Sequence, residues 1–404
     1  MARGGRRRRS GIVGQTAPTH REVEREARRR ETKVARRRII LAALVSVALV
    51  AGAVALTTWI NRAPEVTPPV VESPPDSGAS LLVGLTDDDG SLASIALVSA
   101  HSSLGSRIVL FPPSLAAVLP GYGERDVRDA VAFGGEDLFR LTITNLLGIR
   151  IDSVGVASVA DFAAVFEDPL TVELTQPLIV AVAGAETVEF GQGRAERAAA
   201  DLARLLSEQG TGDQLALLVR QGAVWEAAFD AAADDGLILD RVLESLGLAS
   251  DVSYQALSTA VVADPLLTSA IPTNRAVGVG PNAERYTVST EDGAAFVDEV
   301  LDYLRIADEP RVRVEILNGN GLVGTTAPIA RVLIESGFRV VFTDNADRQD
   351  YTLSRFIAQG SDHQAAAVAV QRLLGSGEVF LEQRQPSGVV DLTIIVGSDL
   401  ATQG

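Results

Sequence analysis

Hydrophobic and polar positions divide the chain into stretches of different periodicity, and the first clear stretch is apolar throughout. Residues 39–60 form a run of 22 residues without a charged side chain. At a helical rise of about 1.5 Å per residue the run covers about 33 Å, enough for a bilayer core of about 30 Å. A cleaved signal peptide has an apolar region of only about 7–15 residues. We therefore predict a retained transmembrane helix at 39–60, with cleavage at the small residues 51–55 as the alternative.

Charge on either side of this run predicts its orientation. Residues 1–38 hold 14 Lys and Arg against 4 Glu, and Arg36 to Arg38 directly precede the run. Because positive flanks stay on the cytoplasmic side, we predict a cytoplasmic Arg-rich segment at 1–38 and an extracytoplasmic body. Residues 61–80 contain five prolines, a composition typical of an extended linker. The predicted location is the cell membrane, single-pass, with the N-terminus cytoplasmic.

Strands and helices alternate beyond the linker, which predicts an α/β layer fold over residues 81–307. Apolar runs and helical spacing predict strands at 80–85, 91–100, 107–111 and 151–158, and helices at 127–147 and 159–168. From Arg194 to about Asp264 we predict short amphipathic helices separated by glycines. One predicted helix face carries Ala199, Leu202, Leu205 and Leu206. These helices either cover the core or form the walls of an apolar groove.

The last segment, residues 311–400, is predicted to form a small α+β domain. Its pattern gives strands at 312–317, 338–343, 351–358, 378–381 and 389–396 and helices at 327–336 and 362–374. Pro310 marks the predicted hinge to this domain, because proline interrupts the preceding helical pattern. The chain is thus predicted as an α/β protein with a transmembrane helix, a Pro-rich stalk, an α/β domain and a small α+β C-terminal domain.

Composition narrows the possible chemistry. Cysteine is absent, which excludes disulfides, zinc–thiolate sites and a cysteine nucleophile. The three histidines, His20, His101 and His363, are scattered, so we predict no metal site, no cofactor and no catalytic triad. The net charge is −16, and since residues 1–38 carry +10, the remainder carries −26. An acidic body lacks the basic face typical of nucleic-acid binding, so we predict no nucleic-acid partner.

The segment Val314 to Gly324, "VEILNGNGLVG", raises the question of a phosphate-binding loop. Its glycines match the dinucleotide fingerprint G-x-G-x-x-G, and Asp344 lies 25 residues after Gly319. However, a P-loop would need a lysine that is missing here. The segment is also predicted to lack the parallel βαβ continuation of a dinucleotide-binding sheet. We therefore predict a glycine turn that permits positive φ and close strand–helix packing.

Several motifs of the last domain resemble the LytR C-terminal domain of bacterial envelope proteins. They are "VEILNGNGLVG" with its following helix, then "FIAQG", "AVAVQRLLG" and "DLTIIVGSDL", in this order over about 90 residues. The resemblance implies binding or assembly, because that family has no established catalytic chemistry. The candidate loop contacts are Asn318, Gly319, Asn320, Gly321 and Gly324. The Arg- and Ala-rich composition fits an actinobacterial source.

Residues 81–206 resemble a degenerate LytR-CpsA-Psr (LCP) domain, a family that transfers polyprenyl-pyrophosphate-linked polymers onto the cell wall. The motifs "LLVGL", "FGGEDLF", "LLGIRID" and "RAERAAADL" follow the order of that family. Its P-R-D-T motif falls on Pro112 to Leu115, its R-x-D element near Ser91 to Leu97 and its R-x-R pair near 187–193, each without the expected charges. Only Arg194 and Arg197 resemble family arginines, on a predicted helix. They are candidates for binding an anionic lipid or polymer.

These departures decide between hypotheses about function. Displacing a pyrophosphate needs cations, and usually Mg²⁺ on a carboxylate, to neutralise developing charge. The sequence therefore predicts a pseudo-enzyme without catalytic residues that binds a wall polymer, a polyprenyl-linked precursor or an active LCP transferase. The alternative is a divergent LCP glycopolymer transferase with relocated arginines. A third hypothesis, a transcriptional attenuator, would need a cytoplasmic body, against the predicted orientation.

Overall fold

The computed structural model describes residues 78–101, 104–248, 257–258, 266–277, 284–382 and 389–401. The predicted cytoplasmic segment, membrane helix and most of the linker lie at 1–77, outside these residues, and stay predictions. No helix within the described ranges is long and apolar enough to span a bilayer. The described residues group into one compact unit, which is built around two five-stranded sheets.

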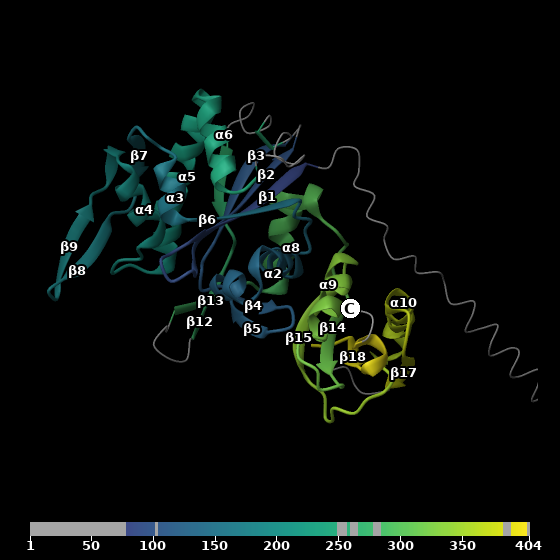
Figure 1. The fold of residues 1–404 in the computed structure, drawn as a ribbon. Coiled ribbons are helices and arrows are strands. Elements are labelled where there is room, and N and C mark those ends of the chain that lie inside the picture. The colour runs from purple at the N-terminus through teal and green to yellow at the C-terminus, as the bar shows by residue number, and fades with distance from the viewer. Residues whose placement is uncertain are drawn as a thin grey trace, which may run out of the picture. The chain divides into compact units, whose positions relative to one another are not determined.

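The first sheet has the strand order β11-β3-β2-β1-β6 (Figure 1). Its strands are β1 (Ala79–Thr86), β2 (Leu92–His101), β3 (Gly105–Phe111), β6 (Ser153–Ser158) and β11 (Leu266–Ala270). Strands β1, β2 and β3 are antiparallel, while β6 pairs with β1 and β11 pairs with β3 in parallel. Every residue of β2 is buried, as expected of a strand covered on both faces. The four strands predicted before residue 160 are confirmed.

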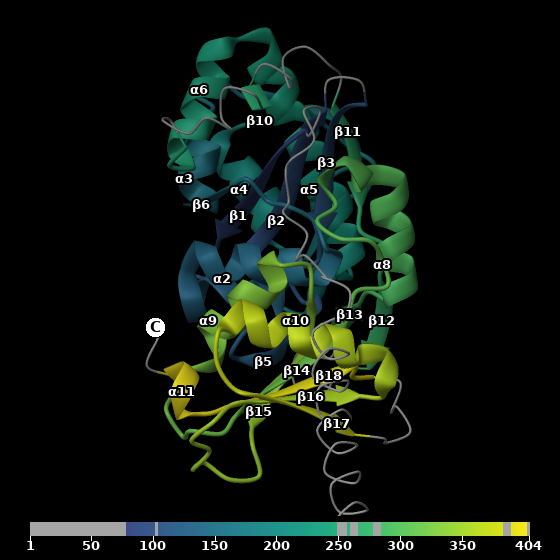
Figure 2. The same cartoon turned by 90° about the vertical axis from the view of Figure 1, so that its right-hand side faces the viewer.

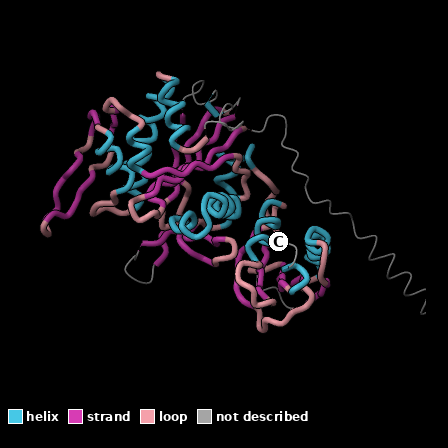
Figure 3. Tube along the Cα trace, viewed as in Figure 1, coloured by secondary structure: helices cyan, strands magenta, loops and turns pink. Residues whose placement is uncertain are grey.

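Helices cover both faces of this sheet (Figure 3). One face is covered by α3 (Val159–Ala164), α4 (Ala199–Ser207), α5 (Gln214–Asp234) and α6 (Gly236–Ser245). The other is covered by η1 (Val127–Asp129), α2 (Ala130–Leu147), α8 (Thr290–Phe296), η2 (Val297–Leu301) and η3 (Asp302–Leu304). Because side chains alternate along a strand, Val83 enters the first core and Leu82 the second.

Short antiparallel strand pairs surround the first sheet. They are β4 (Ala116–Leu119) with β5 (Gly123–Asp126), β7 (Leu170–Leu174) with β10 (Gly193–Arg197), β8 (Leu178–Val182) with β9 (Ala185–Phe190), and β12 (Asn274–Val277) with β13 (Glu284–Thr287). The prediction that a helix begins at Arg194 is wrong. Pairing with β7 holds residues 193–197 extended, and α4 begins only at Ala199.

Helix α5 corrects a second prediction, because it is continuous where short helices separated by glycines were expected. The helix begins where the Asp213 side chain accepts a hydrogen bond from the Ala216 amide at 2.9 Å, a favourable N-cap. It then runs through Gly222 without interruption. A Cβ at Gly222 would lie 3.3 Å from Thr268 Cγ2 and 3.4 Å from Leu110 Cδ1. The glycine lets the helix approach the sheet closely. In a helix, glycine is about 1 kcal/mol less favourable than alanine, and this packing outweighs that cost.

The second sheet has the strand order β15-β14-β18-β16-β17 (Figure 2). Its elements are β14 (Arg313–Asn318), α9 (Thr326–Glu335), β15 (Arg339–Asn345), β16 (Arg355–Gln359), η4 (Ser361–His363), α10 (Gln364–Leu374), β17 (Glu378–Glu382), β18 (Leu392–Val396) and α11 (Ser398–Ala401). Both β14-α9-β15 and β16-α10-β17 are parallel βαβ units, and only β16 with β18 is antiparallel. The prediction that a parallel continuation is missing is therefore wrong, since helices of 10 and 11 residues suffice to return the chain.

Asn145 of helix α2 bonds directly to the second sheet. Asn145 Nδ2 donates to the Val340 carbonyl at 2.8 Å, and its Oδ1 accepts from the Val340 amide at 2.9 Å. The Asn145 side chain thereby forms the pair of hydrogen bonds that a neighbouring strand would form with Val340 at the free edge of β15. Arg311 donates to the Asn145 carbonyl at 3.1 Å and pairs with Glu309 at 2.7 Å. The segment around the predicted hinge at Pro310 is thus bonded to α2.

Candidate functional site

The predicted position of the transferase motif lies where β3 ends. Ser114 is buried, and both its amide and its hydroxyl donate to Gln214 Oε1, at 3.1 and 2.7 Å. The Leu115 carbonyl accepts from Val127 at 2.8 Å, and the Ser114 carbonyl accepts from the Tyr286 amide at 3.2 Å. We call Pro112 to Leu115 with Gln214 and Tyr286 the β3 corner. Its side-chain hydrogen bonds join neutral groups, so the corner offers no fixed charge to a pyrophosphate.

The guanidinium of Arg285, on β13 beside this corner, is held by two carboxylates. It bonds Asp126 at 2.8 Å and Glu124 at 2.9 Å. Burial disfavours its charged state, but these two ion pairs outweigh burial and raise the pKa of Arg285. Burial first and the charge of Asp126 second also raise the pKa of the Asp129 carboxyl, which favours its neutral form. Arg285 is therefore occupied within the protein and is a poor ligand for phosphate oxygens.

The R-x-D position of the LCP family falls on the buried strand β2, where an aromatic cluster lies against it. Ser94 Oγ accepts a hydrogen bond from Trp225 Nε1 at 3.3 Å. The Trp225 ring lies 4.8 Å from Phe162 and 5.8 Å from Phe229, and it is fully buried. A charged residue at Ser94 would lose its hydration inside an apolar core, at a cost of several kcal/mol. The local packing therefore suits the uncharged residues that this sequence has.

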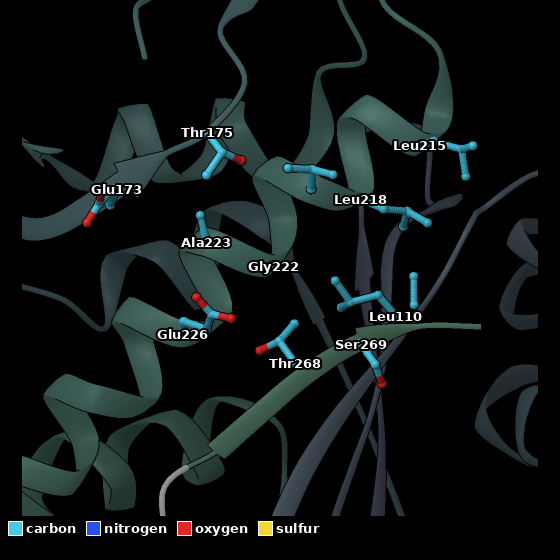
Figure 4. Close-up of a pocket in the computed structure, with 12 residues that line it drawn as sticks. Leu110, Glu173, Thr175, Leu215, Leu218, Gly222, Ala223, Glu226, Thr268 and Ser269 are labelled. Carbon is cyan, nitrogen blue, oxygen red and sulfur yellow. The ribbon is translucent and has the colours of Figure 1, made fainter. Parts of the chain in front are cut away.

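A groove with a volume of about 390 Å³ lies next to the β3 corner, between α5, β3, β7 and β11 (Figure 4). We call it the α5 groove. Leu110, Leu218, Gly222 and Ala223 give it apolar walls, and Leu215, which follows Gln214 of the corner, lies at one end. Thr268 also lines it, and its buried Oγ1 has no hydrogen-bond partner within the described residues. The groove can therefore take an apolar group and one hydrogen-bonding group.

The charged residues that line the α5 groove are acidic. Glu173 comes from β7 and Glu226 from α5, and in Figure 4 both lie on the side away from Leu215 and Leu218. A carboxylate repels a phosphate, and the repulsion grows where apolar walls lower the local dielectric constant. The groove is thus better suited to a neutral or cationic amphiphile than to a naked pyrophosphate.

The two predicted arginines lie on opposite faces of β10. Arg194 is directly opposite Glu173 of β7, so it shares the face that borders the α5 groove. Arg197 lies on the other face, with its guanidinium 4.7 Å from the centre of the Phe190 ring. An offset of three residues along a strand places side chains on opposite faces. The two arginines therefore do not form one binding pair, as a helix would have allowed.

Arg220 is a buried cation that the sequence analysis missed. It is 1% exposed on α5, and its Nη2 donates to the carbonyls of Glu208 and Gln209 at 3.0 and 2.9 Å. Burial lowers its pKa. Its partners are backbone carbonyls, which no side-chain motif encodes. The sequence carries only one weak signal, an arginine inside an apolar helix pattern.

The glycine loop after β14 satisfies its own polar groups. Asn318 Oδ1 accepts from the amides of Asn320 and Gly321, at 3.2 and 3.1 Å, and its Nδ2 donates to the Leu322 carbonyl at 2.8 Å. Gly321 and Gly324 have positive φ. A Cβ at Gly319 would lie 2.7 Å from Ile395 Cγ2. The prediction of a turn with positive φ is confirmed. The close packing at Gly319 is against strand β18 and Tyr351, and not between strand and helix as predicted. A ligand contact of these loop residues stays a prediction.

The family comparison concerns this C-terminal part. Residues 311–400 match the family model described as LytR cell envelope-related transcriptional attenuator. Residues 311–400 are a LytR C-terminal domain. In this chain the LytR C-terminal domain comprises the second sheet with α9, α10 and α11. The description of the family connects the domain to the cell envelope.

Solved structures of LCP proteins are similar to part of the chain. The crystal structure of B. subtilis TagV is 16% identical, with 57% of this chain and 98% of that chain covered and a TM-score of 0.43. B. subtilis TagT is 17% identical, with 59% and 96% covered and a TM-score of 0.45. A LytR-CPS2A-psr family protein, YwtF (TagT), was solved with bound octaprenyl pyrophosphate lipid. It is 17% identical, with 59% of this chain and 95% of that chain covered and a TM-score of 0.44. The search of curated proteins found no match.

Proposed function

We propose that this chain is a non-catalytic, membrane-anchored protein of the cell envelope that binds or organises partners in wall assembly. The partner is a wall polymer, a lipid-linked precursor or an active LCP transferase. The observation that carries the proposal is the β3 corner, where Pro113 and Ser114 stand at the expected arginine and aspartate positions and Ser114 forms a neutral hydrogen-bonded pair with Gln214. The LytR C-terminal domain supports a place in the envelope, and the apolar run at 39–60 supports the anchor.

Physical chemistry favours binding over transfer at this site. A transferase must stabilise the charge that develops on pyrophosphate, and each group that does so typically contributes about 3–4 kcal/mol. The nearby guanidinium of Arg285 is already shared between Asp126 and Glu124. The α5 groove adds the carboxylates of Glu173 and Glu226. A chain with these groups would hold a ligand without lowering the barrier to its reaction.

A divergent LCP transferase is the second candidate, and one observation favours it. Arg194 lies on the strand face that borders the α5 groove, opposite Glu173. A rotated Arg194 side chain could meet a phosphate at the groove mouth. Arg197, on the other face of the same strand over Phe190, has no such approach and is a matched control.

One activity experiment separates the two candidates. The full chain in detergent is incubated with a polyprenyl-pyrophosphate-linked glycan and Mg²⁺, and the release of the lipid product is measured for the unchanged protein, Arg194→Ala and Arg197→Ala. We expect release at the rate of the protein-free buffer in all three samples. Release that exceeds the buffer rate and disappears in Arg194→Ala, but not in Arg197→Ala, would replace the binding proposal by the transferase.

Occupancy of the α5 groove is tested separately by native mass spectrometry of the full chain. Gly222→Leu would place a side chain between Thr268 and Leu110 and fill the groove floor. Ala233→Leu, an exposed position of the same helix, is the matched control. We expect a co-purified amphiphile on the unchanged protein and on the control, and its loss in Gly222→Leu. An equal mass on all three proteins would exclude the groove as the binding site.

A further inference from the structure

The second sheet has one face that its helices do not cover. In Figure 2, α9 and α10 lie on the same side of the sheet. They pack against alternate strand residues, which include Val314, Phe356 and Ile394. Since neighbouring residues of a strand point to opposite faces, Glu315, Ile357 and Thr393 belong to the other side. We call this side the outer face.

A single row of side chains crosses all five strands on the outer face. The register pairs Phe342 with Glu315, Glu315 with Thr393, Thr393 with Ile357, and Ile357 with Phe380. The row therefore begins and ends with an aromatic ring, and between the rings lie Glu315, the buried Thr393 and the apolar Ile357. Adjacent strands lie about 4.8 Å apart, so the two rings are separated by about 19 Å. Phe342 is 46% exposed, and its ring is available for contact.

The polar groups in the middle of the row form a hydrogen-bonded chain. Thr393 Oγ1 donates to Glu315 Oε2 at 3.0 Å, and Gln359 Nε2 donates to Thr393 Oγ1 at 3.3 Å. These bonds hold the carboxylate and the amide in fixed positions on three neighbouring strands. A carboxylate and a primary amide retain further acceptor and donor capacity after such bonds. The centre of the row can thus bond hydroxyl groups of a ligand that lies across it.

The next row of the outer face holds aromatic rings in place, although the Tyr351 ring itself is buried at 6% exposure. Arg355 lies beside Ile395 in the register, and its guanidinium is 5.1 Å from the ring centres of both Phe380 and Tyr351. The Tyr351 hydroxyl donates to Asp347 at 2.8 Å, which fixes the ring. Rigid, flat rings beside hydrogen-bonding groups lose little conformational entropy when a ligand binds.

Charge limits which ligand this surface accepts. The face carries Glu315, Asp344, Glu378 and Glu382 on its strands, against the guanidinium groups of Arg339, Arg348 and Arg355, a small acidic excess. Arg313, at the end of β14, is already paired with Asp391 at 2.6 Å. A phosphate-rich polymer, a nucleic acid or an anionic lipid surface would meet this acidic excess and be repelled. An uncharged ligand is not repelled.

We propose that the outer face of the LytR C-terminal domain binds an uncharged oligosaccharide chain laid across the five strands. A sugar ring presents C–H groups on its faces and hydroxyls at its rim. The electron-rich faces of Phe342 and Phe380 attract polarised C–H groups, while Glu315 and Gln359 bond the hydroxyls between them. The inference rests on the proposed role in the wall and specifies one partner, at a site separate from the α5 groove.

The experiment measures binding of the full chain in detergent to a neutral N-acetylglucosamine hexamer by isothermal titration calorimetry. Poly(glycerol phosphate) is the anionic probe in a second titration. We expect the hexamer to bind and the polyanion to bind at least tenfold more weakly. Phe342→Ala and Phe380→Ala should each weaken hexamer binding about tenfold, since each removes one stacking platform. Phe342→Trp should retain binding, because it keeps an aromatic face.

Phe133→Ala is the control, because Phe133 is a phenylalanine of similar exposure, 40%, on α2, which covers the first sheet. It should leave hexamer binding unchanged. Equal affinity of the unchanged protein, Phe342→Ala and Phe380→Ala would overturn the proposal, as would tighter binding of the polyanion. Capture of a protein through these phenylalanines without hexamer binding would assign the face to a protein partner and also refute the sugar site. None of these results depends on occupancy of the α5 groove or on transfer activity.

Discussion

The two sheets of this protein have the same number of strands but opposite surroundings. The first has helices on both faces, and its central strand β2 is buried along its whole length. The second has helices on one face. Its central strand β18 is also buried, but its outer face carries Phe342 at 46% exposure on the edge strand β15. In a sheet with two covered faces, polar residues must find partners inside the protein. In a sheet with one open face, they remain available to a ligand.

This difference bears on where each sheet carries polar groups. On the first sheet the positions of the expected transferase charges are neutral, with Ser94 bonded to Trp225 and Ser114 bonded to Gln214. On the second sheet the half-buried Glu315 keeps its carboxylate, which accepts a hydrogen bond from the buried Thr393. A buried charge without its catalytic partner would destabilise the fold, whereas a surface carboxylate costs little. Loss of catalysis would thus favour uncharged residues inside and leave the outer face free to vary.

Truncating one aromatic residue on each sheet tests the comparison most strongly. Trp225→Ala leaves a cavity between Phe162 and Phe229 and removes the bond to Ser94. Large aromatic truncations in a core cost about 3–5 kcal/mol. Phe342→Ala removes a side chain that is half in water, so we expect at most about 1 kcal/mol. Urea unfolding followed by circular dichroism gives both free energies of unfolding.

Trp225→Phe controls for the hydrogen bond, since it keeps most of the ring volume and loses Nε1. We expect its cost to lie well below that of Trp225→Ala. Comparable losses for Trp225→Ala and Phe342→Ala would contradict the distinction between a covered and an open sheet.

The connection between the sheets gives the second prediction. Asn145→Ala removes both hydrogen bonds to Val340 and leaves a buried amide and carbonyl unpaired. An unpaired buried polar group costs about 1–3 kcal/mol, so we expect a loss of about 2–4 kcal/mol. Hydrogen exchange followed by mass spectrometry should show faster exchange of the β15 peptide in the variant. Arg140→Ala, which breaks a more exposed ion pair to Glu335 at 2.8 Å, is the control and should cost less than 1 kcal/mol. Unchanged β15 exchange in Asn145→Ala would show that the sheets are held by other contacts.

The sequence predicted the strands of both sheets better than the parts around them. Strand β2 and strand β18 are apolar runs, and such runs identify buried strands directly. The strand β10 was missed because "RAER" has no apolar run, and its conformation depends on pairing with β7, which is distant in the chain. Continuous α5 was missed because Gly222 normally weakens a helix, and only the contact with Thr268 and Leu110 accounts for it.

The candidate sites likewise include one that the sequence predicts and others that it does not. The missing charges at Pro112 to Leu115 can be read from one motif, so the neutral β3 corner could be anticipated. The α5 groove could not, because it joins residues of β3, β7, α5 and β11 that no local pattern relates. The row from Phe342 to Phe380 likewise exists only through the register of five strands. Periodicity identifies which side of a strand is polar, and only the pairing shows which polar groups meet.

The smallest expected effect concerns the edge of the open face and depends on pH. Asp391 is nearly buried, and burial alone would raise its pKa. Hydrogen bonds from the Arg313 side chain and amide lower the pKa, as do the charge of Arg313 and then that of His363. Together they outweigh burial and hold the pKa below its ordinary value. A lowered folded-state pKa means that Asp391 stabilises the fold above its unfolded pKa of about 3.9. This contribution is lost as the pH falls through the folded-state value.

We expect Asp391→Asn to lower the free energy of unfolding by about 1–2 kcal/mol at pH 7. The difference between the two proteins should shrink progressively below about pH 4, measured by urea unfolding from pH 7 to pH 3. Asp344→Asn, at an exposed position of the same sheet, should differ little from the unchanged protein at every pH. A difference for Asp391→Asn that persists undiminished at pH 3 would mean that the shape of the side chain, and not its charge, supports the edge of the sheet.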